Sequence, residues 1–269
     1  MNQYISTTQK VTLACILGLV LTHSLNLPSA QAQQSQRSPN LTEKIKRFFF
    51  GTRPGGVVKG VQRGGAVRGN CPNLDQQTIA LIPSTEKGIA FVEQTISERP
   101  SFWFYVPNLP ASRVDAEFVL LDSQDNEVYS AILPLKQLSG IINLQLPKTV
   151  PALKEGKEYH WVFYAICNPQ NRAADVIVNG WLKRILVNSA LSTQLKTSSP
   201  KERVSVYTDA KLWYETLTAL AELQRSNPQD TEVKTDWANV LQLAGLPKGA
   251  PQTWTTYSLP NRTENSSRN

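Results

Sequence analysis

The chain has 269 residues, a formal net charge of +7, two histidines and three cysteines. Only one histidine, His160, follows residue 32, so the chain beyond that point excludes zinc and copper sites that need several imidazoles. The charge is uneven: residues 33–70 hold eight basic residues against Glu43 alone, whereas residues 71–269 hold nineteen basic and twenty acidic residues. The basicity therefore belongs to one short segment, and the remainder is electrically balanced.

Residues 1–32 have the pattern of a cleavable secretory signal peptide. Lys10 precedes an apolar run, Val11–Leu21, and residues 30–32 (AQA) form a small-x-small cleavage site. A transmembrane helix needs about 20 apolar residues, so this run is too short to span a bilayer. We expect export to the periplasm, the cell envelope or the extracellular space, with a mature chain that begins after this segment. Lipidation of Cys15 is the alternative.

Residues 33–70 read as a disordered basic linker. The segment is rich in Gly, Ser, Gln and Arg and has no period of 2 or 3.6 residues, except for a short basic helix expected over Thr42–Phe50. Clustered cations beside aromatic residues suit contact with an anionic envelope polymer or a membrane surface. The alternative is a spacer that the charges only keep soluble. Export argues against a nucleic-acid partner.

Residues 71–190 have the texture of a β-sandwich. Short apolar runs recur with turn residues between them, as in all-β sandwiches. The expected strands are Thr78–Ile82, Ile89–Ile96, Ser101–Val106, Ala116–Asp122, Glu127–Leu133, Ile141–Leu146, Tyr159–Cys167 and Asp175–Val187. The predicted fold class is mainly β with a C-terminal α hairpin, built on an immunoglobulin-like β-sandwich behind a disordered basic leader.

Two features refine this domain. The spacing of Leu153, Gly156 and Tyr159 resembles the tyrosine corner of immunoglobulin-like sandwiches, where the tyrosine hydroxyl bonds to nearby backbone. Cys71 and Cys167 are the cysteines that follow the signal segment, and two cysteines in an exported chain usually form a disulfide. Two buried free thiols are the alternative.

Residues 191–250 change to a helical pattern. One amphipathic helix is expected over Asp209–Ser226, capped by its first residue, and a second from Asp230 or Thr231 to Ala244, ended by Gly245. A single helical hairpin cannot bury its apolar face alone, so we expect it to dock on the sandwich. Residues 251–269 are expected to form a flexible tail.

Several of these blocks together identify a resemblance. The chain is similar to an exported cyanobacterial family known as domain of unknown function 928, over nearly all of the mature sequence. That resemblance implies export from a cyanobacterial cell, and it implies no activity and no catalytic residues. The blocks that carry it are residues 63–72, 80–83 (ALIP), 99–107 (RPSFWFYVP), 116–129, 159–184 with ICNPQNR at 166–172 and NGW at 179–181, 212–223 and 236–246.

Few catalytic arrangements are available to this sequence. It holds no phosphate loop, GxSxG elbow, HExxH or EF-hand pattern. His160 lies in mid-strand among aromatic residues, where a hydrogen-bonded structural histidine is the expected role. Paired carboxylates can hydrolyse glycosides, although solvated acids at strand edges are the default interpretation. The acids at or near strand ends are Asp115, Glu117, Asp122, Glu127 and Asp175.

Aromatic side chains supply the candidate ligand-binding residues. Exposed flat rings on a β-sandwich stack on sugars, but strands covered on both faces show the same sequence pattern. We keep both interpretations, of which burial in the core is favoured. The candidate residues are Trp103, Tyr105, Trp161 and Tyr164.

The function predicted from sequence is that of a non-catalytic envelope or extracellular interaction module with an unknown protein partner. It predicts no cofactor, no metal and no catalytic residue. The alternative is a carboxylate-based hydrolase of envelope polysaccharide.

Overall fold

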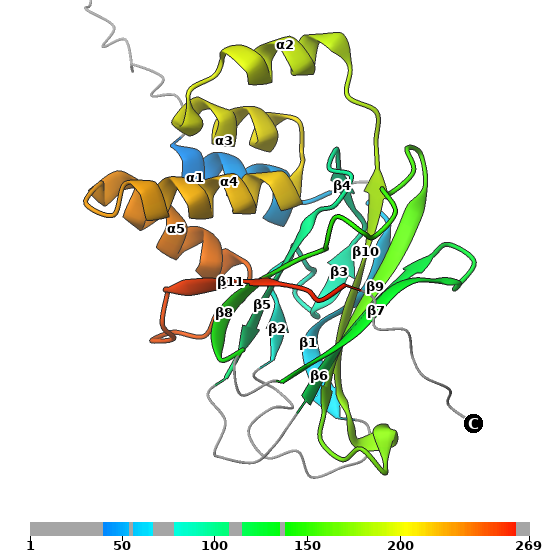
Figure 1. Ribbon diagram of the computed structural model, residues 1–269. Helices are drawn as coiled ribbons and strands as arrows, with labels where there is room; N and C mark the ends of the chain where they lie inside the picture. Colours follow the sequence, from blue (N-terminus) through cyan, green and yellow to red (C-terminus); the bar gives the residue numbers. More distant parts are fainter. Residues whose placement is uncertain (1–39, 54–55, 67–77, 108–114, 135–137, 262–269) are drawn as a thin grey trace, which may run out of the picture. The chain divides into compact units, whose positions relative to one another are not determined.

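A computed structural model describes residues 40–53, 56–66, 78–107, 115–134 and 138–261 (Figure 1). The chain divides into the units 1–37 and 38–269, and every described residue lies in the second. The helical elements are α1 Leu41–Ile45, the π-helical turn η1 Lys46–Phe50, the 3-10 turn η3 Arg172–Ala174, α2 Ser189–Thr197, α3 Pro200–Asp209, α4 Trp213–Ser226 and α5 Thr231–Leu243. The strands are β1 Val58–Ala66, β2 Ile79–Ala80, β3 Ile89–Phe91, β4 Glu93–Thr95, β5 Ser101–Val106, β6 Asp115–Asp122, β7 Glu127–Pro134, β8 Gly140–Gln145, β9 Glu158–Ile166, β10 Val176–Arg184 and β11 Trp254–Ser258.

The predicted mainly β character is confirmed, and the predicted immunoglobulin-like sandwich is not. A sandwich of that kind has two separate antiparallel sheets. Here one path of neighbouring strands runs β11-β8-β5-β2-β1-β10-β9-β6-β7, with β3 paired to β1 and β4 to β10. Two of these pairs, β11 with β8 and β4 with β10, are parallel. The fold is therefore one mixed sheet.

The sheet curls so that its two halves pack against each other. Phe102 and Phe104 of β5 contact the rings of Phe118 on β6 and Phe163 on β9, with centroids 4.8 and 4.6 Å apart. Strands β2, β1 and β10 separate β5 from β9 along the hydrogen-bonded path. Contact across that separation requires curling, and it places an aromatic core inside the curl.

The helices cover the other face of β5, as Figure 1 shows for α4. The Trp103 indole points away from the inner core and donates from Nε1 to the Thr218 hydroxyl of α4 at 3.0 Å. Its ring also lies edge-on to Trp237 of α5, 5.9 Å away. Residues of α4 and α5 thus dock on the sheet, in agreement with the expected docking of this helix pair.

The helical region is larger than the predicted hairpin. Helix α3 begins with a capping box, in which Ser199 accepts from the backbone of Glu202 and Glu202 accepts from the backbone of Ser199. Asp209, predicted to cap the next helix, instead ends α3, and Lys211 turns the chain with φ 57°. Helix α5 begins at Thr231, as the predicted start at Asp230 or Thr231 allows, and Asp230 caps it by accepting from the backbone of Glu232 and Val233.

The short helix expected over Thr42–Phe50 forms as α1 and η1, whereas the predicted disorder is wrong for residues 58–66, which form β1. Ile45 and Phe49 are fully buried among the helices, and β1 lies between β2 and β10 within the sheet. Strand β1 has no alternation of apolar and polar residues, so the sequence pattern did not predict a strand there. Its buried Gln62 instead donates from Nε2 to the carbonyl oxygens of Ile82 and Ala244 at 2.7 and 2.8 Å.

The expected flexible tail also contains structure. Strand β11 pairs in parallel with β8 in continuous register from Trp254↔Ile141 to Ser258↔Gln145. Backbone pairing to an established strand compensates the weak apolar pattern of this segment. Residues 262–269 lie outside the described part of the chain.

The tyrosine corner is confirmed. The backbone N–H of Lys154 donates to the Tyr159 hydroxyl at 2.8 Å. Leu153 is 1% exposed, and Gly156 has φ +75°, a conformation that favours glycine. The local motif therefore forms although the sheet around it is not an immunoglobulin-like sandwich.

Candidate functional site

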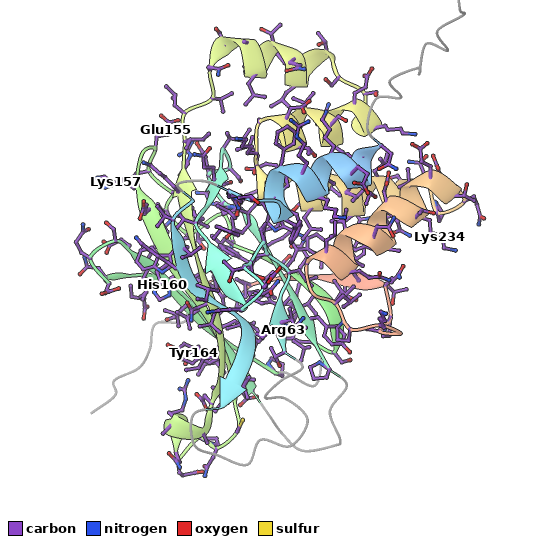
Figure 2. All side chains as sticks on the ribbon, turned by 180° about the vertical axis from the view of Figure 1, so that it is seen from behind. Arg63, Glu155, Lys157, His160, Tyr164 and Lys234 are labelled. Carbon is purple, nitrogen blue, oxygen red and sulfur yellow. The ribbon has the colours of Figure 1, made fainter. Side chains whose placement is uncertain are left out.

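Three of the four candidate aromatic residues lie in the core. Trp103, Tyr105 and Trp161 are 2, 9 and 1% exposed. Trp103 faces the helices, whereas Trp161 packs inside the curl against Phe104, so the four rings form no common surface. Tyr164 is half-buried on the outer face of β9, with the Arg172 guanidinium 5.5 Å from its ring (Figure 2). These positions fit the core interpretation for the three buried residues.

The predicted disulfide concerns one residue that the structure describes. Cys167 directly follows β9, half-buried, with Sγ 3.6 Å from the carbonyl oxygen of Ala165. Cys71 lies outside the described residues, as does the signal segment with Cys15. The pairing stays a prediction.

His160 has a structural setting. Its ring stacks on Trp181 of β10 at 4.6 Å and 9°, and Nε2 lies 3.3 Å from the Asn179 side-chain oxygen. Lys59 of β1 lies over the same indole, 4.4 Å from the ring centroid. Burial lowers the pKa of His160, which favours the neutral imidazole. The stack therefore holds three neighbouring strands together.

Three of the five strand-edge acids lie in local ion pairs or turns. Glu117 and Asp175 both bind the guanidinium of Arg172, at 2.7 and 2.5 Å. Asp122 accepts hydrogen bonds within its own turn, from the backbone of Gln124 and Asn126. A carboxylate neutralised by a guanidinium is a poor general acid or base. Glu117, Asp122 and Asp175 are therefore each engaged in local contacts among the described residues.

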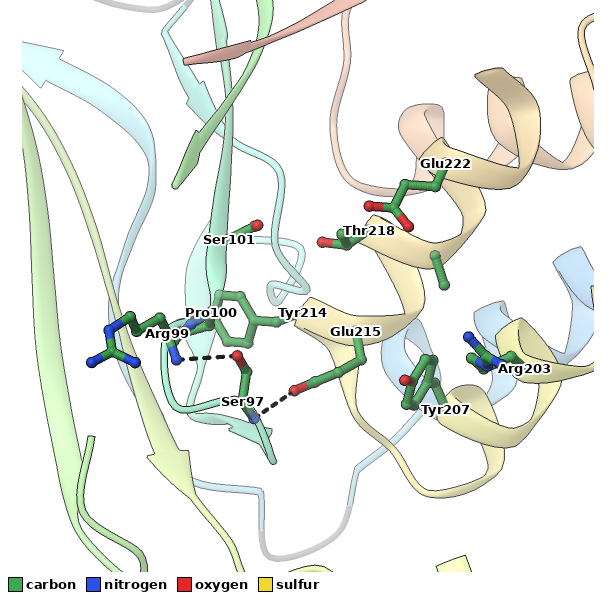
Figure 3. Close-up of a pocket in the computed structure, with 11 residues that line it drawn as sticks. Ser97, Arg99, Pro100, Ser101, Arg203, Tyr207, Tyr214, Glu215, Thr218 and Glu222 are labelled. Atoms are coloured by element: carbon green, nitrogen blue, oxygen red, sulfur yellow. Dashed lines mark hydrogen bonds between the residues drawn. The ribbon is translucent and has the colours of Figure 1, made fainter. Parts of the chain in front are cut away.

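A pocket of about 190 Å³ lies between the connection Ser97–Ser101 and the two helices α3 and α4. We call it the α3–α4 pocket. Figure 3 shows Glu215, Thr218 and Glu222 on one side of α4, with Tyr207 on α3 beside them. The turn at Lys211 brings the two helices side by side. Helix α4 thus presents residues three and seven positions apart on one face, as helical geometry requires.

Glu215 links this pocket to the sheet. Its Oε1 accepts from the Thr95 hydroxyl at 2.5 Å and from the backbone N–H groups of Ile96 and Ser97 at 2.9 and 3.1 Å. Its Oε2 is buried and has no hydrogen-bond partner among the described residues. Burial raises the pKa of Glu215 above its ordinary value, against the hydrogen bonds to the carboxylate that lower it. The carboxyl group is therefore fixed through Oε1, while Oε2 has no hydrogen-bond partner among the described residues.

Helix α3 forms the opposite wall of the pocket with Arg203 and Tyr207. Arg203 donates from Nη2 to the Ser198 carbonyl at 3.3 Å, and its buried Nε has no partner within the described part of the chain. Burial and the charges of Glu215 and Glu222 raise the pKa of Tyr207, and Arg203 lowers it. The Tyr207 hydroxyl is thus influenced by two carboxylates and one guanidinium, which shift its pKa in opposite directions. The pocket is therefore lined by one acidic and one basic residue, each with a buried polar atom that has no hydrogen-bond partner among the described residues.

Sequence reasoning missed this site. Glu215, Thr218 and Glu222 are spaced as one helical face, which was a readable signal within the predicted helix. Helix α3 was not predicted, and the contact of Glu215 with Thr95 joins residues 120 positions apart. Within the described ranges, no group of three or more His, Cys, Asp or Glu side chains could hold a metal ion. No helix in those ranges has the length and apolarity to cross a membrane.

Several cations of the basic leader bind acids of the fold. Lys44 pairs with Asp209 at 2.6 Å, Arg53 pairs with the buried Glu93, and Lys59 pairs with Glu158 at 3.0 Å. These charges contribute to folding contacts and are less available to an external polyanion than a free tail would be. Lys46 and Arg47 remain exposed on η1.

Comparison with known proteins identifies the family of the chain. The model of a family described as a domain of unknown function (DUF928) matches residues 63–254, which is more than two thirds of the 269 residues. None of the curated proteins matches the chain. The matched range includes the entire α3–α4 pocket.

Proposed function

Since the chain belongs to the DUF928 family, whose description names no reaction, we propose a function from the pocket itself: the protein is a non-catalytic binding protein that takes a small polar molecule between α3 and α4. The observation that carries this proposal is that two residues lining one pocket, Glu215 and Arg203, each have a buried polar atom, Oε2 and Nε, without a hydrogen-bond partner among the described residues. Buried polar groups without partners are rare and costly in native folds. A polar ligand, with the small side-chain movement that admits it, supplies those partners.

The other polar groups of the pocket fit the same role. Thr218 uses its oxygen to accept from Trp103, so its hydroxyl proton is free to donate. Glu222 is exposed at the rim. The volume of about 190 Å³ is below the range of drug-sized pockets, so the ligand is a small molecule and not a polymer.

A thermal-shift panel of amino acids, monosaccharides, polyols and short-chain acids tests this proposal. At a ligand concentration of 100 Kd, binding stabilises the fold by about 2.7 kcal/mol, which raises the melting temperature of a chain of this size by roughly 5–10 °C. We expect such a shift in wild type and in the exposed-residue control Glu86→Gln, and its loss in Glu215→Gln. No shift with any class, or an equal shift in Glu215→Gln, contradicts the proposal.

The alternative function, a carboxylate-based hydrolase of polysaccharide, has one supporting observation. Glu215 and Glu222 line the same pocket, and seven helical residues separate their Cα atoms by about 10 Å. Burial keeps Glu215 protonated to higher pH, as a general acid requires. Release of reducing ends from peptidoglycan or envelope polysaccharide, abolished in both Glu215→Gln and Glu222→Gln, would favour this alternative over binding alone.

We also propose that the protein acts outside the cytoplasm. Lys10, the apolar run and residues 30–32 support cleavage after Ala32. The first described element begins at Leu41, so cleavage removes no part of the described fold. The intact mass of the protein recovered from its producing cell tests this, because a retained N-terminus or a lipid adduct on Cys15 contradicts it.

A further inference from the structure

A second site lies where the end of α4, the start of α5 and β11 meet. It is a groove of about 440 Å³, which we call the Arg225–Lys234 groove. The side chains that supply its polar surface are Gln224, Arg225, Lys234, Gln252 and Thr253. None of the described residues that line it is acidic. Lys234 marks its position on α5 in Figure 2, well apart from His160 and Tyr164 on the sheet. The groove therefore has a net positive charge.

Arg225 is held in place without an acidic partner. Its guanidinium lies over the Trp254 ring of β11, 4.8 Å from the centroid, and such contacts orient an arginine side chain. Within the described residues, Arg225 and Lys234 form no ion pair with an acid, whereas Arg53, Arg172 and Arg184 all do. A positioned, unpaired guanidinium presents the planar fork that binds a carboxylate through two hydrogen bonds.

We propose that the Arg225–Lys234 groove binds the carboxylates of an acidic polysaccharide. Arg225 and Lys234 neutralise the carboxylates, and the amides of Gln224 and Gln252 are suited to hydrogen-bond sugar hydroxyls. This site is separate from the α3–α4 pocket and does not depend on it. It also differs from the basic leader, where Lys44, Arg53 and Lys59 are already paired inside the fold.

The surroundings of the groove favour a polysaccharide over a membrane surface. Peripheral membrane binding combines cations with an apolar face that enters the lipid. The exposed large hydrophobic residues of the described chain lie elsewhere, none of them on α4, α5 or β11. They are Val57, Val58, Val61, Ile89, Ile132 and Leu186. The groove combines charge and hydrogen-bonding groups with the rings of Trp237 and Trp254, which line it and are not among the exposed large hydrophobic residues.

Binding of the full chain to polygalacturonate measures the proposal, with the highly methyl-esterified polymer as the uncharged control. We expect Arg225→Gln/Lys234→Gln to lose about tenfold in affinity at low salt. Two variants that also remove two charges serve as matched controls: Lys87→Gln/Lys148→Gln at exposed loops and Lys46→Gln/Arg47→Gln on the leader. Arg225→Lys should bind at an intermediate level, because it keeps the charge and loses the planar fork.

Salt and single substitutions complete the test. Wild-type binding should weaken steeply as the Debye length falls from about 10 Å at 0.1 M salt to about 3 Å at 1 M. If the double variant unfolds, exposed Lys234→Gln alone should still lose about threefold. Three results with polygalacturonate would overturn the proposal: no binding by wild type, equal losses in all charge-removal variants, or a loss only in the leader variant. Two results with other probes would also overturn it: unchanged affinity for the esterified polymer, or binding to phosphatidylglycerol vesicles instead.

Discussion

Replacing Phe49 with alanine tests whether the basic leader is part of the fold. Phe49 is fully buried, and its ring lies edge-on to the Trp213 indole with centroids 5.1 Å apart. Trp213 is itself 1% exposed and donates from Nε1 to the Leu81 carbonyl at 3.0 Å. The phenyl ring therefore fills space between the leader, α4 and the sheet.

The expected loss is large. Truncation of a buried phenylalanine to alanine costs about 3–5 kcal/mol, from lost transfer free energy and from the cavity that remains. Typical domains have about 5–15 kcal/mol of total stability. Phe48, the adjacent residue, is only partly buried, so Phe48→Ala is a matched control that should lose about half as much or less.

Urea denaturation of the full chain, followed by tryptophan fluorescence, measures both variants. The midpoint for Phe49→Ala should fall well below those of wild type and Phe48→Ala, with the slope m little changed. A loss under about 1 kcal/mol for Phe49→Ala would mean that the leader is a spacer, and it would refute this account of residues 41–50.

Three further outcomes are expected. Tyr159→Phe should lose about 0.5–1.5 kcal/mol in the same denaturation assay, because the Lys154 N–H loses its acceptor; no loss would remove the tyrosine corner as a stabilising contact. Since the folded pKa of Glu215 lies above its ordinary value of 4.5, the native state binds the extra proton there, and wild-type stability should fall relative to Glu215→Gln as pH rises from 4.5. A constant difference across pH would contradict this burial argument. Non-reducing peptide mapping should recover Cys71 linked to Cys167, whereas alkylation of both thiols without reduction would contradict that pairing.

Local patterns predicted local elements well. The expected strand Ser101–Val106 has the bounds of β5, and Glu127–Leu133 differs from β7 by one residue. Both carry strong β-branched and aromatic runs between turn residues. The tyrosine corner is also short-range and was readable from spacing alone, and the helix expected from Asp230 or Thr231 begins at Thr231.

The errors arose where long-range contacts decide the structure. Strand β1 contains VKGVQRGGA, with three glycines and three polar residues, and its partners β2, β3 and β10 supply the pairing. Curling of the sheet depends on contact between Phe104 and Phe163, which no local period encodes. The α3–α4 pocket depends in the same way on Glu215 reaching Thr95. Sequence periodicity identifies elements, while their assembly depends on partners distant in the chain.

The central claim, that the α3–α4 pocket binds a small polar molecule, is tested most directly by amide chemical-shift mapping. The isotope-labelled full chain is titrated with the panel compound that most raises its melting temperature, in parallel with Glu215→Gln. We predict saturable shifts confined to residues 97–101, 203–207 and 215–222 in wild type, and their loss in the variant. Shifts centred elsewhere, or the same shifts in Glu215→Gln, would contradict the claim.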